Sequence, residues 1–160
     1  MEMLALETPV RSTTLAVTTY RHTEFVDLTE RVESVIAETG LRHGIVNVQS
    51  LHTTADIVVN EHEPLLLTDF VAFLDRVASR AGTYKHDDDS IRTVNLGVDE
   101  RPNGHAHCQA LVLGTSVCLN VVGGRLNLGT WQRLFLVELD GARRREISIV
   151  AIGSFDRSRR

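Results

Sequence analysis

Short runs of apolar and β-branched residues, separated by turn residues, recur along most of the chain and predict β-strands. The run "STTLAVTTY" near the N-terminus is typical, because Thr and Val suit a pleated surface. Strands are expected over 12–20, 45–50, 55–60, 108–122, 125–141 and 145–153, with a Gly-Gly turn at 123–124. Residues 83–104 are polar and predict a long loop, and loops of this length inside a compact domain are usually functional or disordered.

Two other segments follow the period of a helix. Residues 23–41 predict a short extended piece and then an amphipathic helix, with Thr29 as its N-cap and Gly40 as its stop. Residues 64–82 open with Pro, close with Gly and place their apolar side chains on one helical face. Two main helices and about seven to nine strands predict an α+β fold with a mainly antiparallel sheet or sandwich.

Composition changes this picture little. The 160 residues, 42% hydrophobic and 24% charged, are expected to form one domain over 1–160, since no repeat or linker divides them. A net charge of −4 and 5% aromatic residues argue against nucleic-acid binding. No apolar run approaches the ~20 residues that span a bilayer, so the cytoplasm is the expected location. Cys108 and Cys118 are expected to be reduced core residues.

The histidines are the main chemical signal. Four of the seven lie at the edges of predicted elements or in the polar loop, namely His52, His86, His105 and His107. On a strand, His105 and His107 would point to the same face. Each of these imidazoles could be a metal ligand or an acid–base group, and the alternative is a hydrogen-bonded surface histidine.

Acidic and amide side chains supply candidate partners. Asp87, Asp88 and Asp89 follow His86 directly and could orient its ring or add an oxygen ligand, although such a triplet is more often solvated. Asn60 and Glu61 end an apolar strand, where a carboxylate could act as a base.

Three later residues are weaker candidates for substrate binding. Trp131 and Gln132, in "LGTWQ", combine a flat apolar surface with an amide, but packing alone would explain the Trp. Ser116, in "LGTS", could donate a hydrogen bond to an anion, although hydroxyls are common in strands.

Five segments together resemble the YjbQ family, whose members are described as secondary thiamine-phosphate synthases or as uncharacterised proteins. The resemblance covers about 13–153 and is carried by "LHTTADIVVNE", "YKHDD", "NGHAHCQALVLGTS", "GGRLNLGTWQRLFLVELDG" and "RRREISIVAIG". Each segment alone is weak, but their order and spacing are specific. Asp56 departs from the family pattern, because relatives usually carry a small or apolar residue there.

The resemblance implies an α+β fold that assembles as a homotrimer, with a polar pocket near the subunit boundary. The positions that match family motifs are His52, Thr53, Asn60, Glu61, His86, His107, Trp131, Gln132 and Glu138. A shared site built from His52, His86 and His107 could hold a divalent metal, zinc or magnesium, with zinc the natural choice for imidazole ligands.

Two functions of different class follow from the resemblance. As an enzyme, the protein would join a pyrimidine diphosphate to a thiazole phosphate as a side activity, or act on another phosphorylated or anionic small molecule. His52, Glu61 and His107 would be catalytic, and Thr53, Asn60, Ser116, Trp131 and Gln132 would bind substrate. The alternative is a non-catalytic trimer that binds a metal or an anion.

Overall fold

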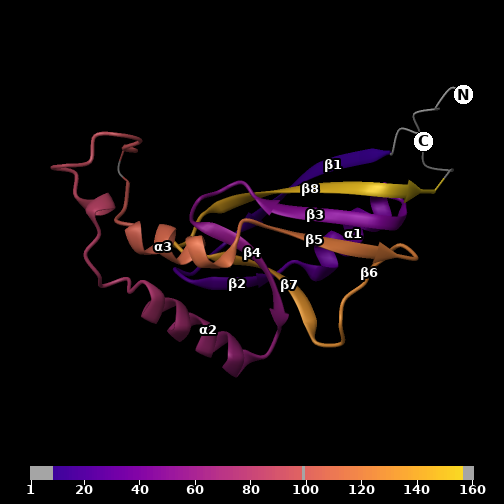
Figure 1. Cartoon of the computed structure of the whole chain (residues 1–160), viewed down its shortest axis with the longest axis horizontal. Coiled ribbons are helices and arrows are strands. Elements are labelled where there is room, and N and C mark those ends of the chain that lie inside the picture. Colours follow the sequence, from indigo (N-terminus) through magenta and orange to yellow (C-terminus); the bar gives the residue numbers. More distant parts are fainter. Residues whose placement is uncertain (1–8, 99, 157–160) are drawn as a thin grey trace, which may run out of the picture.

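The computed structural model describes residues 9–98 and 100–156. Within them the chain forms two antiparallel sheets, three α-helices and one 3₁₀ turn (Figure 1). The strands are β1 (Val10–Thr18), β2 (Glu24–Asp27), β3 (Leu41–Ser50), β4 (Ala55–Glu61), β5 (Ser116–Val122), β6 (Arg125–Leu126), β7 (Gln132–Glu138) and β8 (Arg144–Phe155). The helices are α1 (Thr29–Thr39), α2 (Pro64–Val77), the 3₁₀ turn η1 (Lys85–Asp87) and α3 (Gly104–Leu113). The predicted α+β class and antiparallel pairing are confirmed.

The two sheets have the strand orders β1-β8-β3-β5-β6 and β2-β7-β4. Strand β7 lies at the centre of the smaller sheet, and its run Leu134-Phe135-Leu136-Val137 is fully buried. Alternate side chains of that run enter different apolar clusters. Leu134 and Leu136 pack with α1 and the larger sheet, and Phe135 and Val137 pack with α2 and α3. Burial on both faces explains why this strand is a continuous apolar run.

The largest difference from the sequence prediction is α3. Residues 108–122 were expected to be one strand opened by His107, but 104–113 are helical and only 116–122 form a strand. The fold therefore has a third α-helix. Because successive helical residues are rotated by about 100°, His105 and His107 point to different sides of α3 instead of sharing a face.

Local details bear out some predictions and correct others. Gly40 ends α1 in the left-handed conformation, with φ of 72°. Thr29 is the first helical residue of α1 and not its N-cap, and its hydroxyl accepts a hydrogen bond from the Leu134 amide instead. Cys108 and Cys118 are free, as expected, but both are exposed and not in the core.

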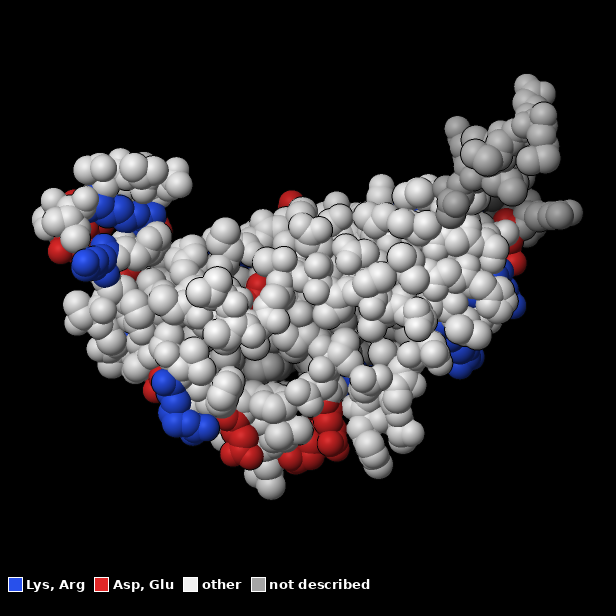
Figure 2. Space-filling model, in the orientation of Figure 1, with Lys and Arg blue, Asp and Glu red and all other residues white. Residues whose placement is uncertain are grey.

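The segment between α2 and α3, described over residues 78–98 and 100–103, forms a connecting arm. It leaves the body of the molecule and returns to it at the start of α3 (Figure 1). Figure 2 shows basic and acidic side chains gathered on this arm, with a notch between it and the sheets. None of the helices in the described ranges is long and apolar enough to cross a membrane.

Candidate functional site

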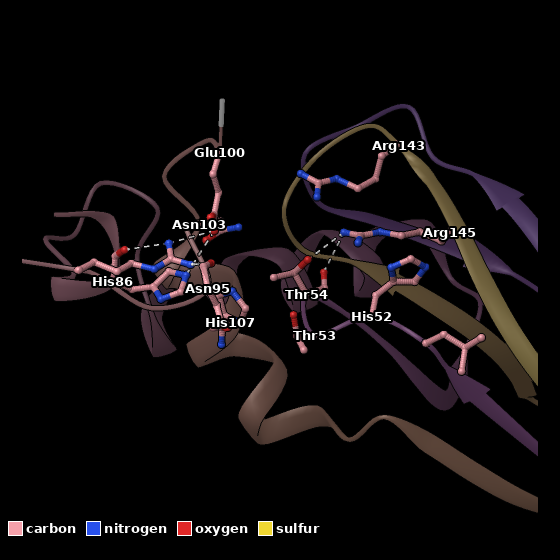
Figure 3. A pocket seen from close by; sticks show the side chains of 12 residues that line it. His52, Thr53, Thr54, His86, Asn95, Glu100, Asn103, His107, Arg143 and Arg145 are labelled. Carbon is pink, nitrogen blue, oxygen red and sulfur yellow. Dashed lines mark hydrogen bonds and ion pairs between the residues drawn. The ribbon is translucent and has the colours of Figure 1, made fainter. Parts of the chain in front are cut away.

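A polar cavity of about 490 Å³ lies where the connecting arm and α3 face the ends of the sheets. Its two walls are seen in Figure 3, with the arm and α3 on one side and the sheets on the other. The sheet wall contains His52, Thr53, Thr54, Arg143 and Arg145. The arm wall contains His86, Arg92, Asn95, Glu100, Asn103 and His107.

Arg145 anchors the sheet wall through a buried ion pair. Its guanidinium makes two contacts with the Glu138 carboxylate, including an Nε–Oε2 hydrogen bond of 2.7 Å, and both side chains are at most 2% exposed. Burial raises the pKa of Glu138, but hydrogen bonds from Arg145 and from the Asp140 amide outweigh it, so the net pKa lies below the usual value. Arg145 also donates to the Thr54 hydroxyl at 3.0 Å. This network fixes a cation at the cavity wall.

A second buried carboxylate links the two walls. Asp140, which follows β7, forms an ion pair with Arg143. Its Oδ2 also accepts a hydrogen bond of 3.4 Å from the side-chain amide of Asn103. Asp140 is 2% exposed, whereas the Arg143 side chain is 37% exposed and faces the cavity. Oδ2 of Asp140 therefore contacts both the Arg143 guanidinium and the side chain of Asn103 at the start of α3.

His52 is held by the backbone of β8. The Glu146 amide donates to Nε2 of His52 at 2.8 Å, so that nitrogen is unprotonated and the proton of the neutral ring lies on Nδ1. Burial, followed by the Arg145 charge, lowers the pKa of His52 below its ordinary value. At neutral pH this ring is an uncharged hydrogen-bonding group.

On the arm wall, His86 and His107 lie edge to face with ring centroids 4.6 Å apart. Burial, followed by the His86 charge, lowers the pKa of His107. Nε2 of His86 is 3.6 Å from Oε1 of Glu100, too far for a hydrogen bond, and this buried nitrogen has no hydrogen-bond partner among the described residues. The same oxygen of Glu100 forms an ion pair with Nη1 of Arg92 at 3.1 Å.

Asp87 and Asn103 shape the start of α3. Oδ1 of Asp87 accepts hydrogen bonds from the amides of Asn103 and Gly104 at 2.9 and 2.8 Å, so this carboxylate caps α3. Asn103 is 7% exposed, and its Oδ1 has no partner among the described residues. A buried acceptor without a partner is costly, so Asn103 destabilises this wall locally.

The charges of the cavity favour an anion. Arg92, Arg143 and Arg145 line it, and Glu100 is the one carboxylate among its described lining residues. Arg145 is 2% exposed and paired with Glu138, so it contributes its charge from within the wall, whereas Arg143 is paired with Asp140 and, at 37% exposure, is available to a ligand. Such fixed cations and imidazoles suit phosphate or carboxylate groups.

The fit to a metal is poorer. Within 9–98 and 100–156 there is no group of three or more His, Cys, Asp or Glu side chains arranged to hold an ion. His86 and His107 are neighbours, but His52 stands on the opposite wall (Figure 3). The zinc or magnesium site expected from the three imidazoles stays a prediction.

Four predicted site residues lie at this cavity, namely His52, Thr53, His86 and His107. Asn60 and Glu61 do not, since they end β4 at the edge away from Thr54, roughly 20 Å along a strand. Ser116 is exposed at the start of β5 and is not a lining residue.

Trp131 lies just before β7, and Gln132 is the first residue of β7, where it pairs with Glu61 at the end of the sheet away from Thr54. Trp131 is 70% exposed, and Oε1 of Gln132 accepts a hydrogen bond from the Gly129 amide at 2.8 Å. Gln132 therefore stabilises the turn, and in this chain neither residue reaches the cavity.

The arginines were missed as site residues, although the sequence holds a signal for one of them. In β8, Arg145 has the same two-residue phase as Ile147 and Ile149, whose side chains are buried. A charged residue in the buried phase of a strand needs a buried partner, and Glu138 at the end of β7 provides it. Arg143 lies just before β8 and carries no such phase signal.

Comparison with known proteins gives one consistent family. The family model described as "UPF0047 protein YjbQ-like" matches residues 13–154. A UPF0047 protein of Methanothermobacter thermautotrophicus is 35% identical over 153 residues, which cover 96% of this chain and 94% of the relative. The UPF0047 protein YugU of Bacillus subtilis is 33% identical over 141 residues, or 88% of this chain and 98% of the relative.

Solved structures agree with this result. A YbjQ-like protein of unknown function from Sulfolobus solfataricus superposes with a TM-score of 0.81 at 35% identity, covering 92% of this chain and 100% of that one. A hypothetical protein from Aeropyrum pernix gives 0.78 at 36% identity, covering 90% and 99%. On both sequence and fold, the chain belongs to the YjbQ-like, or UPF0047, family.

Proposed function

We propose that the cavity binds the phosphate groups of a phosphorylated small molecule and that the protein is a transferase of the thiamine-phosphate synthase type. The reaction would join a pyrimidine diphosphate to a thiazole phosphate and release pyrophosphate. The observation that supports this most directly is the meeting of Arg143, Arg145 and three imidazoles around one cavity. A homotrimer is part of the proposal, as the resemblance implies.

The chemistry asks for cations around a leaving group. The bond between the pyrimidine methylene carbon and the diphosphate oxygen breaks, and the electron pair leaves with pyrophosphate. The thiazole nitrogen then supplies the pair for the new carbon–nitrogen bond. Arg143, which is exposed to the cavity and held by Asp140, would stabilise the negative charge that grows on pyrophosphate, and the buried Arg145 would add its charge from within the wall. The neutral rings of His52 and His107 are suited to donate hydrogen bonds to phosphate oxygens.

One observation favours the second candidate, a non-catalytic anion-binding trimer. Glu61 would have supplied a base beside the imidazoles, but it lies at the far end of β4. Glu100, the carboxylate that is at the cavity, is already paired with Arg92. Binding of an anion without chemistry needs no base, so the arginines and imidazoles alone would serve it.

The experiment measures pyrophosphate binding and product formation on the same samples. Calorimetry with pyrophosphate compares wild type with Arg143→Ala, and an assay of the coupled pyrimidine and thiazole phosphates compares wild type with His107→Ala. His43→Ala is the matched control, because His43 is an exposed imidazole outside the cavity. We expect Arg143→Ala to weaken pyrophosphate binding at least tenfold, and His107→Ala to lower turnover by about 10²-fold or more, the usual range for loss of a hydrogen-bond donor to the charge that develops on a leaving group.

The outcomes separate the two candidates. Equal product from wild type and His107→Ala removes the catalytic assignment. Pyrophosphate binding that depends on Arg143, without product from any variant, favours the non-catalytic trimer. Absence of pyrophosphate binding overturns both.

A further inference from the structure

A second cavity lies on the other side of α3. It measures about 360 Å³ and has no lining residue in common with the phosphate-binding cavity. The two are separated because His105 and Gln109 are one helical turn apart on one side of α3, whereas His107 is turned toward the other. The lining side chains are His22, Thr23, Asp75, Arg80, His105 and Gln109, together with Val71.

Gln109 presents a fixed and unpartnered acceptor. Its Nε2 donates to the carbonyls of Leu74 and Ala78 at 3.1 and 2.9 Å, at the C-terminal end of α2. These two acceptors determine which end of the amide is nitrogen, so Oε1 is the other end. Gln109 is 4% exposed, and Oε1 has no partner in the described part of the chain. A donor from outside the protein would satisfy it.

His105 adds a second buried polar atom without a partner. It is 3% exposed and stacks on His22, with ring centroids 5.1 Å apart and an angle of 24°. Tyr84 lies 6.4 Å away, also measured between ring centroids. The ring is therefore fixed by packing, yet its Nε2 makes no hydrogen bond with a described residue. Two side chains that are more than nine-tenths buried, each with a polar atom that has no described partner, therefore line this cavity.

The exposed part of the cavity carries one charge of each sign. Asp75 uses Oδ1 to accept from the Ser79 hydroxyl and the Arg80 amide at 3.3 and 3.1 Å. The Arg80 guanidinium forms no ion pair with a described residue, and the Thr23 hydroxyl lies nearby in the lining. One carboxylate and one guanidinium, not paired with each other, are complementary to a molecule that carries both charges.

We propose that this second cavity binds a small zwitterion of the α-amino acid class. The ammonium group donates to Oε1 of Gln109 and is balanced by the charge of Asp75. The carboxylate accepts from the guanidinium of Arg80, and Nε2 of His105 provides a further hydrogen bond. A simple cation would leave Arg80 unmatched, and a simple anion would leave Gln109 and Asp75 unmatched. The proposal goes beyond the proposed transferase function and does not depend on it.

The test uses L-alanine as the probe on the full-length protein, with propionate and ethylamine as molecules that each lack one of its charges. Binding is followed by NMR of the histidine ring protons, whose signals are assigned with variants that each lack one histidine. L-Alanine is expected to shift the signals of His22 and His105 in a saturable way and to leave those of His86 and His107 in place. Propionate and ethylamine are expected to bind at least tenfold more weakly.

Variants place the two charged groups. Arg80→Ala and Asp75→Asn are expected to weaken L-alanine binding at least tenfold, and the latter keeps the oxygen that accepts from Ser79. Arg76→Ala is the matched control, since Arg76 is an exposed arginine in the last turn of α2, four residues before Arg80, and lines a different, apolar groove. It is expected to bind as wild type does.

Three results would overturn the proposal: no saturable shift at His22 and His105, equal binding of L-alanine and propionate, or unchanged binding by Arg80→Ala. In each case ordered water is left as the partner of Gln109 and His105. Pyrophosphate titration on the same samples reports the other cavity through His86 and His107, so failure of one proposal is distinguishable from failure of the other.

Discussion

Asp56 offers a stability prediction with a magnitude that follows from the structure. It lies in β4, is fully buried, and neither of its oxygens makes a hydrogen bond with a described residue. Burial raises its pKa from 3.8 to about 6, and the nearby backbone amide of Gly114 opposes this in part. Each pH unit between these values corresponds to about 1.4 kcal/mol, so the ionised carboxyl destabilises the fold by roughly 3 kcal/mol at neutral pH.

The sign of the pH dependence follows from proton binding. Between pH 3.8 and about 6 the folded chain binds the Asp56 proton more tightly than the unfolded chain does. The contribution of Asp56 to the free energy of unfolding therefore falls as pH rises through this window, and the full penalty applies above it. Asp56→Val removes the titrating group with little change in volume. Relative to wild type, its free energy of unfolding is expected to increase by roughly 3 kcal/mol as pH rises from 4 to 7.

The assay is denaturant unfolding of wild type, Asp56→Val and Asp56→Asn at fixed protein concentration and at several pH values from 4 to 7.5. In thermal unfolding of the same variants, 3 kcal/mol corresponds to an increase in Tm of about 6–12 °C for a chain of this size. Asp56→Asn is the control for polarity, since it keeps a buried polar group but cannot ionise. Both variants should show the same pH dependence relative to wild type, with a smaller gain for Asn. A stability difference that is constant with pH would show that the carboxyl is hydrated or paired, and would refute the reasoning.

Three further predictions concern the sheet, the cavity and the assembly. Gly153→Ala is expected to destabilise the fold by more than about 3 kcal/mol in denaturant unfolding, since a Cβ there would lie 2.1 Å from the His43 carbonyl and residue 153 has φ of 151°. Sulfate is expected to bind the cavity more tightly in calorimetry as pH falls below 7, because protonation of His52 and His107 adds positive charge; since burial lowers both pKa values, the gain is expected at lower pH than for a free imidazole, and an affinity that does not change with pH would contradict it. Light scattering is expected to give the mass of about three chains, and a monomer at micromolar concentration would contradict this. Metal analysis of the same sample tests for bound zinc or magnesium.

Strands and the first two helices could be predicted because their patterns are local. Gly40 and Pro64 mark real element ends, and β4 is read correctly to within one residue. The sequence "GHAHCQALVL" carries no comparable signal, because its apolar residues follow neither a two-residue nor a 3.6-residue period. It is helical because Ala106 packs against β7 and Gln109 caps the end of α2, contacts between residues far apart in the chain.

The error at α3 had a direct effect on the prediction of the site. A strand would have placed His105 and His107 in one pocket, and the helix divides them between two. The residues predicted only by motif had mixed outcomes for the same reason. His52, His86 and His107 line one cavity because the connecting arm and α3 face one end of the sheets, whereas Glu61 lies at the opposite end of its strand. A motif match identifies candidate residues, but the direction of each strand determines which of them lie close enough to act together.

The buried polar atoms without partners are concentrated around this one helix. In the described part of the chain they belong to Asp56, His86, Asn103, His105 and Gln109. Asn103, His105 and Gln109 are on or next to α3, His86 contacts His107 of α3, and Asp56 lies near Gly114 at its end. Each such group costs about 1–3 kcal/mol, so their number in one place is a substantial local destabilisation. The two sheets, which are densely paired and apolar inside, can tolerate that cost, and a ligand that satisfied these atoms would recover part of it. The helix that is hardest to predict from local pattern is therefore also the element at which binding should most increase stability.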